Sequence, residues 1–517
     1  MEKKSANFFS GSMGPEKAAF FSVLVFGLLT HIHIFSVNYI FHDSVTLDNL
    51  GYTYSSGRWA LGFLDDAARR TLGAYQLPFI NGFISIGLIA ITVLILIRTL
   101  KVKSVVTAAF IGMMLVSFPS VASHFAFMFT APPYFLSMLM ATLAVYLINE
   151  RCSTLRFASA VALTTFSIGI YQAYLSFSIS LALAIVIIDG LRNEKEFIGL
   201  IKKGLVFVSM LIIGLILYLS INKLIISAKG IELTAYQGLN KIGRIDFALL
   251  PKAIYQCYYD QLKPSWLGII TSLFERKVSF IVIILGSAVF LRLVWLSKAK
   301  METRLLLIFL AVISPLALNS VYLMSPGSMN GVHSLMRMSL CFTYILPVLY
   351  VEILCEKAGR HKGICVDRLL AAVLSIVLAV VPPMYCYRNN TAYLNAELAE
   401  EQAEAYLASM VTRIRSTEGY RDELPVAYIG FGIKDQSFDR LPTYGKIYTY
   451  ILSFSLEDML NTDLWQEFCA IHLGWDPAEV EDTDYYCGLE QVQQMPCYPD
   501  DGSICVIDGA VVVKFSN

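Results

Sequence analysis

Charged residues are scarce in this sequence. Lys, Arg, Asp and Glu make up 15% of its 517 residues, whereas hydrophobic residues make up 56%. Soluble domains carry about 25% charged residues, and the mean hydropathy of +0.60 points away from them as well. The composition therefore excludes an ordinary soluble protein and predicts a polytopic membrane protein. The formal net charge of zero gives no sign of a nucleic-acid partner.

Several motifs of soluble enzymes are also missing. The sequence has no Walker sequence, GxGxxG loop, zinc motif or Ser-His-Asp arrangement, so we do not expect an active site fed by a soluble nucleotide. No motif predicts a cofactor, and a divalent cation remains an open alternative. The ten cysteines show no metal-ligand spacing. A disulfide between Cys487 and Cys497 stays open if the tail is extracytoplasmic.

Long apolar runs follow one another as far as residue 386. A helix that crosses the hydrocarbon core needs about 20 apolar residues. The first run is too long for a signal peptide and lacks a small-residue cleavage site, so we expect it to remain as a span. Tyr171-Gln172 interrupts one continuous run and predicts a hairpin of two short or tilted helices. In total we expect eleven spans, at residues 18–41, 78–99, 104–122, 132–149, 157–171, 173–190, 204–226, 278–297, 304–323, 334–355 and 369–386.

Basic residues alternate along these spans. Eleven spans place six basic groups on one side of the membrane, from the N-terminal lysines to the loop after residue 355, and that side is the cytoplasm by the positive-inside rule. The opposite short loops, 123–131 and 324–332, contain no Lys or Arg. We therefore expect a multi-pass protein of the cell membrane with a cytoplasmic N-terminus and an extracytoplasmic C-terminus. Residues 42–77 and 227–277 are then outer loops.

The tail differs in character from the membrane part. We expect a transmembrane domain over residues 1–390 and a small extracytoplasmic α/β domain over 391–517. Residues 395–416 are charged, Ala-rich and helical in pattern, and 426–431 predict a buried strand followed by a turn. Strand-like alternation on both sides of Asp508-Gly509 predicts a hairpin. The expected fold is an α-helical polytopic membrane protein with a small α/β domain.

The strongest candidate site lies in the first outer loop. Its amphipathic pattern over residues 42–64 suits a segment that lies along the membrane surface. Asp43, close to the interface, could take a proton from a hydroxyl group, and Asp48 is a weaker candidate acid. Arg58 could clamp a phosphate in bidentate fashion, and Trp59 could stack on a sugar ring. The alternatives are a helix-capping Asp43, a snorkelling Arg58 and an interface anchor at Trp59.

Further candidate residues lie at the predicted outer end of the spans. Arg337 sits a few residues inside the tenth span, where a charge is rare and suggests function, although the side chain could also snorkel outwards. Tyr171 and Gln172 interrupt an apolar run at membrane depth. The remaining candidates for substrate binding are polar residues of outer loops, for which capping or plain solvent exposure is the alternative: His124, Tyr236, Gln237 and Arg244.

An acid directly after the first span, an amphipathic outer segment and a Gly-Arg-aromatic triplet resemble the membrane glucosyltransferases of the serotype-converting (GtrII-like) type. The matching residues are His42-Asp43 and Gly57-Arg58-Trp59, and Tyr171-Gln172 is similar to a further feature of that family. The resemblance covers roughly residues 15–390. The family often has two adjacent acids, whereas Ser44 follows Asp43 here.

The resemblance implies a GT-C-type glycosyltransferase that uses a polyprenyl-phosphate sugar. The expected donor carries glucose on undecaprenyl phosphate, the expected acceptor is a cell-envelope glycan outside the membrane, and Asp43 is the expected catalytic residue. A lipid donor explains why no nucleotide motif is needed. The alternatives are a transporter or flippase for a lipid-linked glycan, against which stands the lack of an inverted repeat, and a glycan polymerase.

Overall fold

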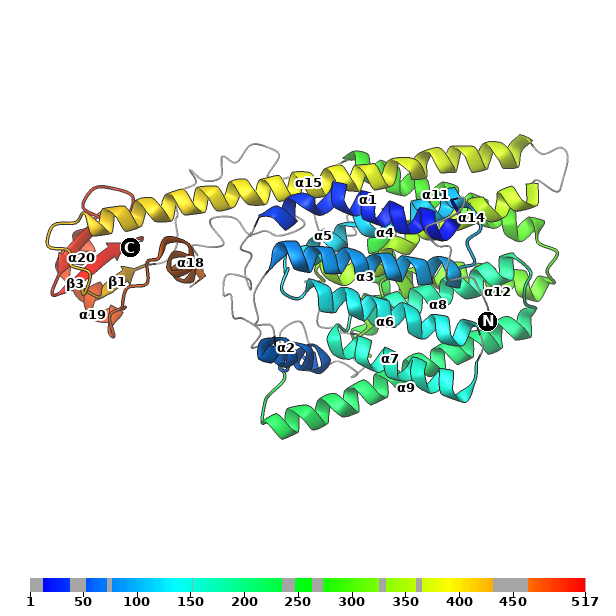
Figure 1. Ribbon diagram of the computed structural model, residues 1–517, viewed down its shortest axis with the longest axis horizontal. Coiled ribbons are helices and arrows are strands. Elements are labelled where there is room, and N and C mark those ends of the chain that lie inside the picture. The colour runs from blue at the N-terminus through cyan, green and yellow to red at the C-terminus, as the bar shows by residue number, and fades with distance from the viewer. Residues whose placement is uncertain are drawn as a thin grey trace. The chain divides into compact units, whose positions relative to one another are not determined.

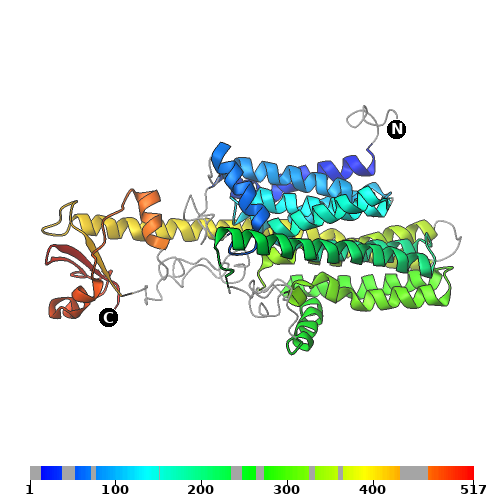
Figure 2. The same cartoon turned by 90° about the horizontal axis from the view of Figure 1, so that it is seen from below.

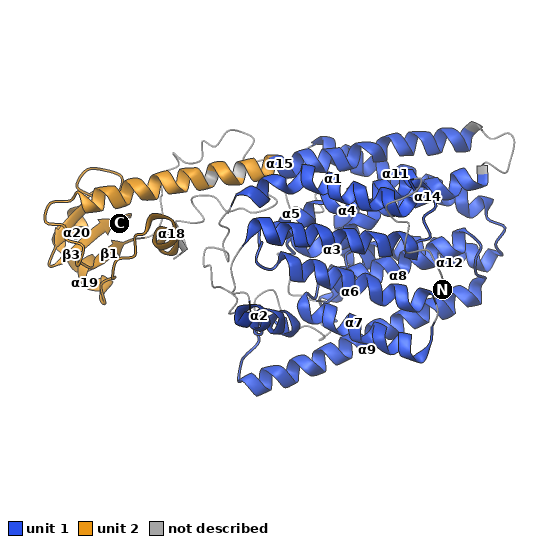
Figure 3. Ribbon diagram, viewed as in Figure 1, with its two compact units in different colours: residues 1–38, 50–390 blue, residues 39–49, 391–517 orange. Residues whose placement is uncertain are grey.

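The computed structural model divides the chain into two compact units (Figure 3). Unit 1 comprises residues 1–38 and 50–390, and unit 2 comprises residues 39–49 and 391–517. The structure describes residues 13–37, 53–71, 77–150, 152–234, 247–262, 273–324, 332–358, 365–430 and 464–516.

Unit 1 is built from helices that run side by side (Figures 1 and 2). Their bounds are α1 Pro15–Ser36, α2 Trp59–Thr71, α3 Pro78–Thr99, α4 Val105–Ser117, α5 Pro119–Phe125, α6 Ala131–Glu150, α7 Thr154–Ile170, α8 Tyr174–Leu191, α9 Phe197–Lys229, α10 Leu250–Leu262, α11 Leu273–Leu296, α12 Met301–Leu318, α13 Val321–Met324, the 3₁₀ helix η4 Ser334–Cys341, α14 Phe342–Ala358 and α15 Cys365–Arg415, of which the residues up to 390 belong to unit 1.

The structure confirms the predicted helical membrane fold. In the described residues, nine helices are long and apolar enough to cross a membrane, and the pair α4 and α5, bent by 42°, makes a tenth candidate. The remaining predicted span corresponds to α7, an apolar helix of 17 residues. All eleven predicted spans therefore coincide with apolar helices.

Local sequence explains the breaks between these helices. Pro119 stands at the first position of α5 and cannot donate a hydrogen bond back into α4, so the span bends there. Tyr171 has extended backbone angles after the end of α7, and α8 begins at Tyr174. The hairpin that Tyr171-Gln172 predicted is thus confirmed.

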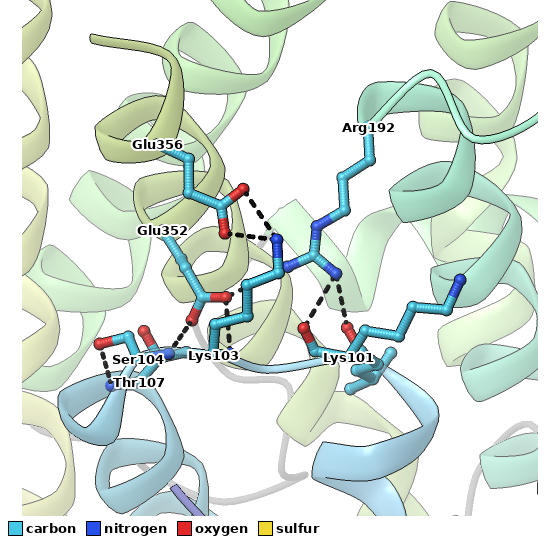
Figure 4. A network of polar contacts seen from close by, with 8 residues as sticks. Lys101, Lys103, Ser104, Thr107, Arg192, Glu352 and Glu356 are labelled. Carbon is cyan, nitrogen blue, oxygen red and sulfur yellow. Dashed lines mark hydrogen bonds and ion pairs between the residues drawn. The ribbon is translucent and has the colours of Figure 1, made fainter. Parts of the chain in front are cut away.

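A buried polar network joins several helix ends far from the first outer loop (Figure 4). Glu352 of α14 accepts hydrogen bonds from the backbone nitrogens of Lys103 at 3.0 Å and Ser104 at 3.3 Å. Arg192, after the end of α8, donates to the same carboxylate at 3.1 Å. Because both side chains are buried, the pair closes this end of the bundle without an unpaired charge.

The same end gathers the basic groups of alternate loops. Ion pairs join residues that lie at helix ends far apart in the sequence: Arg98 with Glu16, Lys101 with Asp189, Lys103 with Glu356 and Arg292 with Asp367. Helix α8 runs from Tyr174 to Leu191, about 25 Å at 1.5 Å per residue, so its two ends lie in different surroundings. The basic end is the one that the charge alternation predicts to be cytoplasmic.

In the described residues, unit 2 contains a small sheet of three strands. Strand β1 (Val426–Ile429) pairs in parallel with β3 (Ala510–Lys514), and β2 (Ile504–Ile507) pairs with β3 antiparallel. Asp508 and Gly509 both have positive φ, as a tight hairpin turn requires. The predicted strand and hairpin are confirmed. Short helices accompany the sheet: α18 Leu464–Leu473, α19 Thr483–Gly488 and α20 Glu490–Gln494.

Alternation along β3 gives the sheet two packed faces. Val511 and Val513 join a buried cluster with Leu407 of α15, whereas Val512 packs with Val492 on the other face. Successive side chains of a strand point to opposite faces, so a strand of valines can serve both clusters. Cys487 and Cys497 are free thiols, so the disulfide left open by the sequence is not formed.

One predicted helix boundary differs from the structure. The span at 369–386 and the helix at 395–416 are parts of one helix, α15. Residues 391–404 contain no glycine or proline and are rich in Ala, Leu and Glu, which favour continuation of a helix. In the first outer loop, residues 53–57 form turns and the helix begins only at Trp59.

Candidate functional site

A compact turn presents Arg58 directly before helix α2. The backbone nitrogen of Gly57 donates to the carbonyl of Tyr54 at 2.9 Å, and that of Arg58 donates to the carbonyl of Thr53 at 2.8 Å. The Tyr54 hydroxyl donates to Asp66 of α2 at 2.7 Å and so ties the turn to the helix that follows it. The turn therefore fixes the backbone position from which the Arg58 side chain extends.

Side chains of the connection between α7 and α8 and of helix α9 hold this turn. Gln172, between α7 and α8, donates to the carbonyl of Ser56 at 2.9 Å. The hydroxyl of Tyr218 on α9 donates to the carbonyl of Gly57 at 3.0 Å and accepts from Gln172 at 3.2 Å. Gln172 and Tyr218 are buried. Gln172, which the sequence singled out, thus positions the backbone beside Arg58.

Glycine is required at position 57 by this arrangement. Its φ is +71°, a left-handed conformation that other residues rarely adopt. A Cβ atom there would lie 2.9 Å from the Tyr218 hydroxyl and 3.3 Å from the Gln172 amide nitrogen. Both the backbone and the polar neighbours therefore exclude a side chain.

We expect Gly57→Ala to open the turn and expose Arg58 to trypsin. A left-handed alanine costs about 1–2 kcal/mol, and cleavage that follows an opening equilibrium should then become about tenfold faster. The rate of cleavage after Arg58 in purified protein measures this. Gly230→Ala is the matched control, because Gly230 has φ +65° with open space around it. Equal cleavage rates in Gly57→Ala and wild type would contradict the role of the turn.

Arg58 extends from this turn against a stacked pair of tyrosines. The rings of Tyr134 and Tyr171 stack with centroids 4.2 Å apart. The guanidinium carbon of Arg58 lies 5.3 Å from the Tyr171 centroid and 5.8 Å from that of Tyr134, and Arg58 also donates to the Tyr134 hydroxyl at 2.9 Å. Aromatic faces stabilise a guanidinium, so a cation is held in a defined place at this end of the bundle.

His124 lies under the same aromatic pair and is fully buried. Its ring stacks on Tyr174, with its Nε2 atom 3.3 Å from the Tyr174 hydroxyl. It also meets the edges of Tyr134 and Tyr171, with centroids 5.5 and 5.8 Å away. His124 therefore supports the rings that contact Arg58.

Helix α5 connects this cluster to the segment that carries Arg337. Ser120 of α5 donates to the carbonyl of Ser334 at 2.7 Å, and the hydroxyl of Ser123 meets that of Ser334. Ser334 begins η4, three residues before Arg337. Arg58 and Arg337, almost 280 positions apart, therefore belong to clusters on either side of one short helix.

Arg337 is buried with an acid that the sequence reasoning did not select. Its Nη1 atom lies 3.1 Å from a carboxylate oxygen of Asp260 on α10, and its Nη2 atom donates to the Tyr322 hydroxyl at 2.6 Å. His333 stands nearby, and desolvation together with the charge of Arg337 holds the pKa of His333 below its ordinary value. The charge of a paired, buried arginine therefore disfavours the protonated form of the nearby imidazole.

Other predicted site residues have different surroundings. Trp59 is buried away from solvent, edge-on to Phe63 and Phe166, and it anchors the start of α2 on α7. Five candidates lie outside the described residues: Asp43, Asp48, Tyr236, Gln237 and Arg244. In the part of the chain that is described, no three His, Cys, Asp or Glu side chains are grouped as metal ligands.

Several residues of these clusters were missed at the sequence level, although some left a signal. Tyr218 and Asn222, whose amide nitrogen would lie 3.5 Å from a Cβ atom at position 57, are four positions apart in a mostly apolar span. This spacing puts two polar groups on one helix face. Gln256, which donates to Asp260 at 2.8 Å, has the same spacing from it on α10. Tyr134 and Tyr322 left no comparable signal, because aromatic residues are common near membrane interfaces.

Comparison with known families bears on the chemistry of these clusters. A family model described as glucosyl transferase GtrII matches residues 33–353, more than half of the chain. This stretch includes Arg58, Tyr171, Gln172 and Arg337. Comparisons with curated proteins and with solved structures gave no significant match. The family match confirms the resemblance drawn from the first outer loop: the chain belongs to the GtrII glucosyl transferase family and is a multi-pass membrane glycosyltransferase.

Proposed function

We propose that this protein transfers glucose from a polyprenyl-phosphate donor to a cell-envelope glycan on the extracytoplasmic face. The observation that carries the proposal is the fixed cation, Arg58, held by the turn before helix α2 and by the rings of Tyr134 and Tyr171. Arginine binds phosphate through a planar fork of donors. A lipid-linked donor also agrees with the absence of a nucleotide-binding motif in the sequence.

The proposed reaction is a single displacement. Asp43 takes the proton of an acceptor hydroxyl, the freed oxygen attacks the anomeric carbon of glucose, and the bond to the polyprenyl phosphate breaks with inversion. Arg58 and Arg337 stabilise the negative charge that grows on the departing phosphate. The leaving group needs no proton donor, because the lipid phosphate departs as a stable anion.

The remaining candidate residues have supporting parts in this proposal. Tyr171, Gln172 and His124 keep the Arg58 turn and its aromatic rings in place. Trp59 acts on substrate only indirectly, through the start of α2. We propose that the outer-loop residues contact the sugar or the acceptor: Asp48, Tyr236, Gln237 and Arg244.

A transfer assay with purified protein tests the function. The protein in lipid vesicles is incubated with radiolabelled polyprenyl-phosphate glucose and an isolated cell-envelope glycan, and label in the glycan is measured. Transfer of glucose, and less transfer with a mannose or galactose donor, is the expected result. Movement of the labelled lipid across the bilayer without any transfer would instead favour a flippase.

We expect the C-terminal unit to be extracytoplasmic. The basic ends of the helices in unit 1 gather at one end of the bundle, and positive charge favours the cytoplasmic side. A cysteine introduced at Gly419 in a variant without the tail's exposed thiols should react with a membrane-impermeant reagent in intact cells. Labelling that requires permeabilised cells would reverse the orientation and rule out the outer-face reaction.

A further inference from the structure

The surroundings of Arg337 are assembled from three separate segments. Asp260 comes from α10, Tyr322 from α13 and Arg337 from η4. Asp260 accepts a hydrogen bond from the Tyr322 hydroxyl as well as the ion pair from Arg337, and Gln256 donates to its other oxygen at 2.8 Å. Asp260 and Arg337 are both at least nine-tenths buried.

Helix α10 is fastened to the bundle around Asp260. The Asn319 amide donates to the carbonyl of Cys257 at 3.1 Å, and the Cys257 thiol donates to the carbonyl of Asn319 at 3.3 Å. Gln261 donates to the Thr343 hydroxyl of α14 at 3.1 Å. An isolated helix of 13 residues is marginally stable in water, so these contacts explain how an outer-loop helix delivers a carboxylate to a fixed place.

The pairing constrains the direction of the guanidinium. Asp260 holds one terminal nitrogen of Arg337 and Tyr322 holds the other, with the guanidinium carbon 5.6 Å from the Tyr322 ring centroid. A guanidinium is planar and has five donors in a rigid fork. These two contacts therefore set the plane of the guanidinium and hold it in one orientation.

We propose that Asp260 is a positioning residue for phosphate binding by Arg337. It holds the guanidinium in the orientation that receives the lipid phosphate, and α10 thereby couples the second outer loop to donor binding. This inference rests on the proposed function, because the phosphate belongs to the proposed donor. If the Asp260–Arg337 pair only stabilised the fold, or if Asp260 acted as an independent base, substitutions of Asp260 would have different effects on lipid binding and turnover.

Binding and turnover together test the proposal. The dissociation constant for polyprenyl phosphate, without a sugar, is measured on the purified full-length protein for wild type, Asp260→Asn, Arg337→Lys and the double variant. Asp260→Asn is expected to weaken binding about tenfold. In the Arg337→Lys background the same change should have less than about a threefold effect, because residues that act through one another are not additive.

The controls separate positioning from general stability. Asp367→Asn removes another buried carboxylate from an arginine pair, with Arg292, in a different part of unit 1, and it should leave lipid binding unchanged. Asp260→Glu should recover part of the affinity, since it restores the charge. If Asp260→Asn does not fold, Tyr322→Phe provides a second variant, for which we expect about threefold weaker binding.

The possible results distinguish a positioning role of Asp260 from a purely stabilising or a catalytic one. Equal losses on both backgrounds, equal losses in the Asp260 and Asp367 variants, or a fall in kcat with unchanged lipid binding would overturn the positioning role. A wild-type protein that fails to bind polyprenyl phosphate would overturn it as well. If the wild type binds the lipid and the coupling is found, but no glucose is transferred, the proposed function fails while the positioning role stands.

Discussion

Asp43→Asn is expected to lower the turnover number by roughly 10²–10⁴-fold, the usual contribution of a general base. Asparagine keeps the size of the side chain and most of its hydrogen bonds, but it cannot accept the proton of the acceptor hydroxyl. Membrane insertion and donor binding should persist. The measurement is single-turnover transfer of glucose at saturating donor, with donor binding followed separately.

This substitution also separates catalysis from helix capping. Asparagine caps a helix about as well as aspartate does, so near-normal transfer by Asp43→Asn would leave Asp43 as a cap and remove the proposed base. Asp48→Asn is the comparison within the same loop. A larger loss there would move the base to Asp48.

Arg58→Lys is expected to weaken donor binding by about 10–100-fold. Lysine keeps the positive charge but loses the planar fork that binds phosphate in bidentate fashion. It also loses the hydrogen bond to Tyr134 and the flat contact with the Tyr171 ring. Equilibrium binding of polyprenyl-phosphate glucose to the purified variant measures the effect.

Arg69→Lys is the matched control for that change. Arg69 lies on the exposed side of α2, where it pairs with Asp65 one helical turn away at 3.1 Å. Exposed pairs of this kind contribute at most about 1 kcal/mol, so donor binding should be close to that of wild type. Unchanged affinity in Arg58→Lys as well would place the phosphate clamp elsewhere.

The membrane fold was predictable because its signal is long and simple. Each predicted span is an apolar run of at least 15 residues, and the loss of hydrogen-bonding water in a bilayer leaves a helix as the natural structure for such a run. Where helices stop was harder to predict. A polar stretch after residue 386 suggests an end, yet α15 continues to Arg415 because helix-forming residues follow it without interruption.

Site residues were predictable only where their residue type is rare in that part of a membrane protein. Arg58, Arg337 and Gln172 stand out because charged and polar groups are costly inside or beside a bilayer. Asp260 did not stand out, since the sequence places it in a predicted outer loop, where acids are common, and only the folded contacts show that it is buried with Arg337. Pairings between distant segments, such as Gly57 with Tyr218, depend on packing that a single sequence does not encode locally.

Helix α9 has 33 residues, which extend about 50 Å at 1.5 Å per residue, whereas the hydrocarbon core is about 30 Å thick. Tyr218 stands about 32 Å along the helix from Phe197, one bilayer thickness from its basic end. This tyrosine supports the turn before Arg58, so helix α9 fixes the distance between that turn and the basic end of the helix. That distance is set by the number of helical residues between Phe197 and Tyr218.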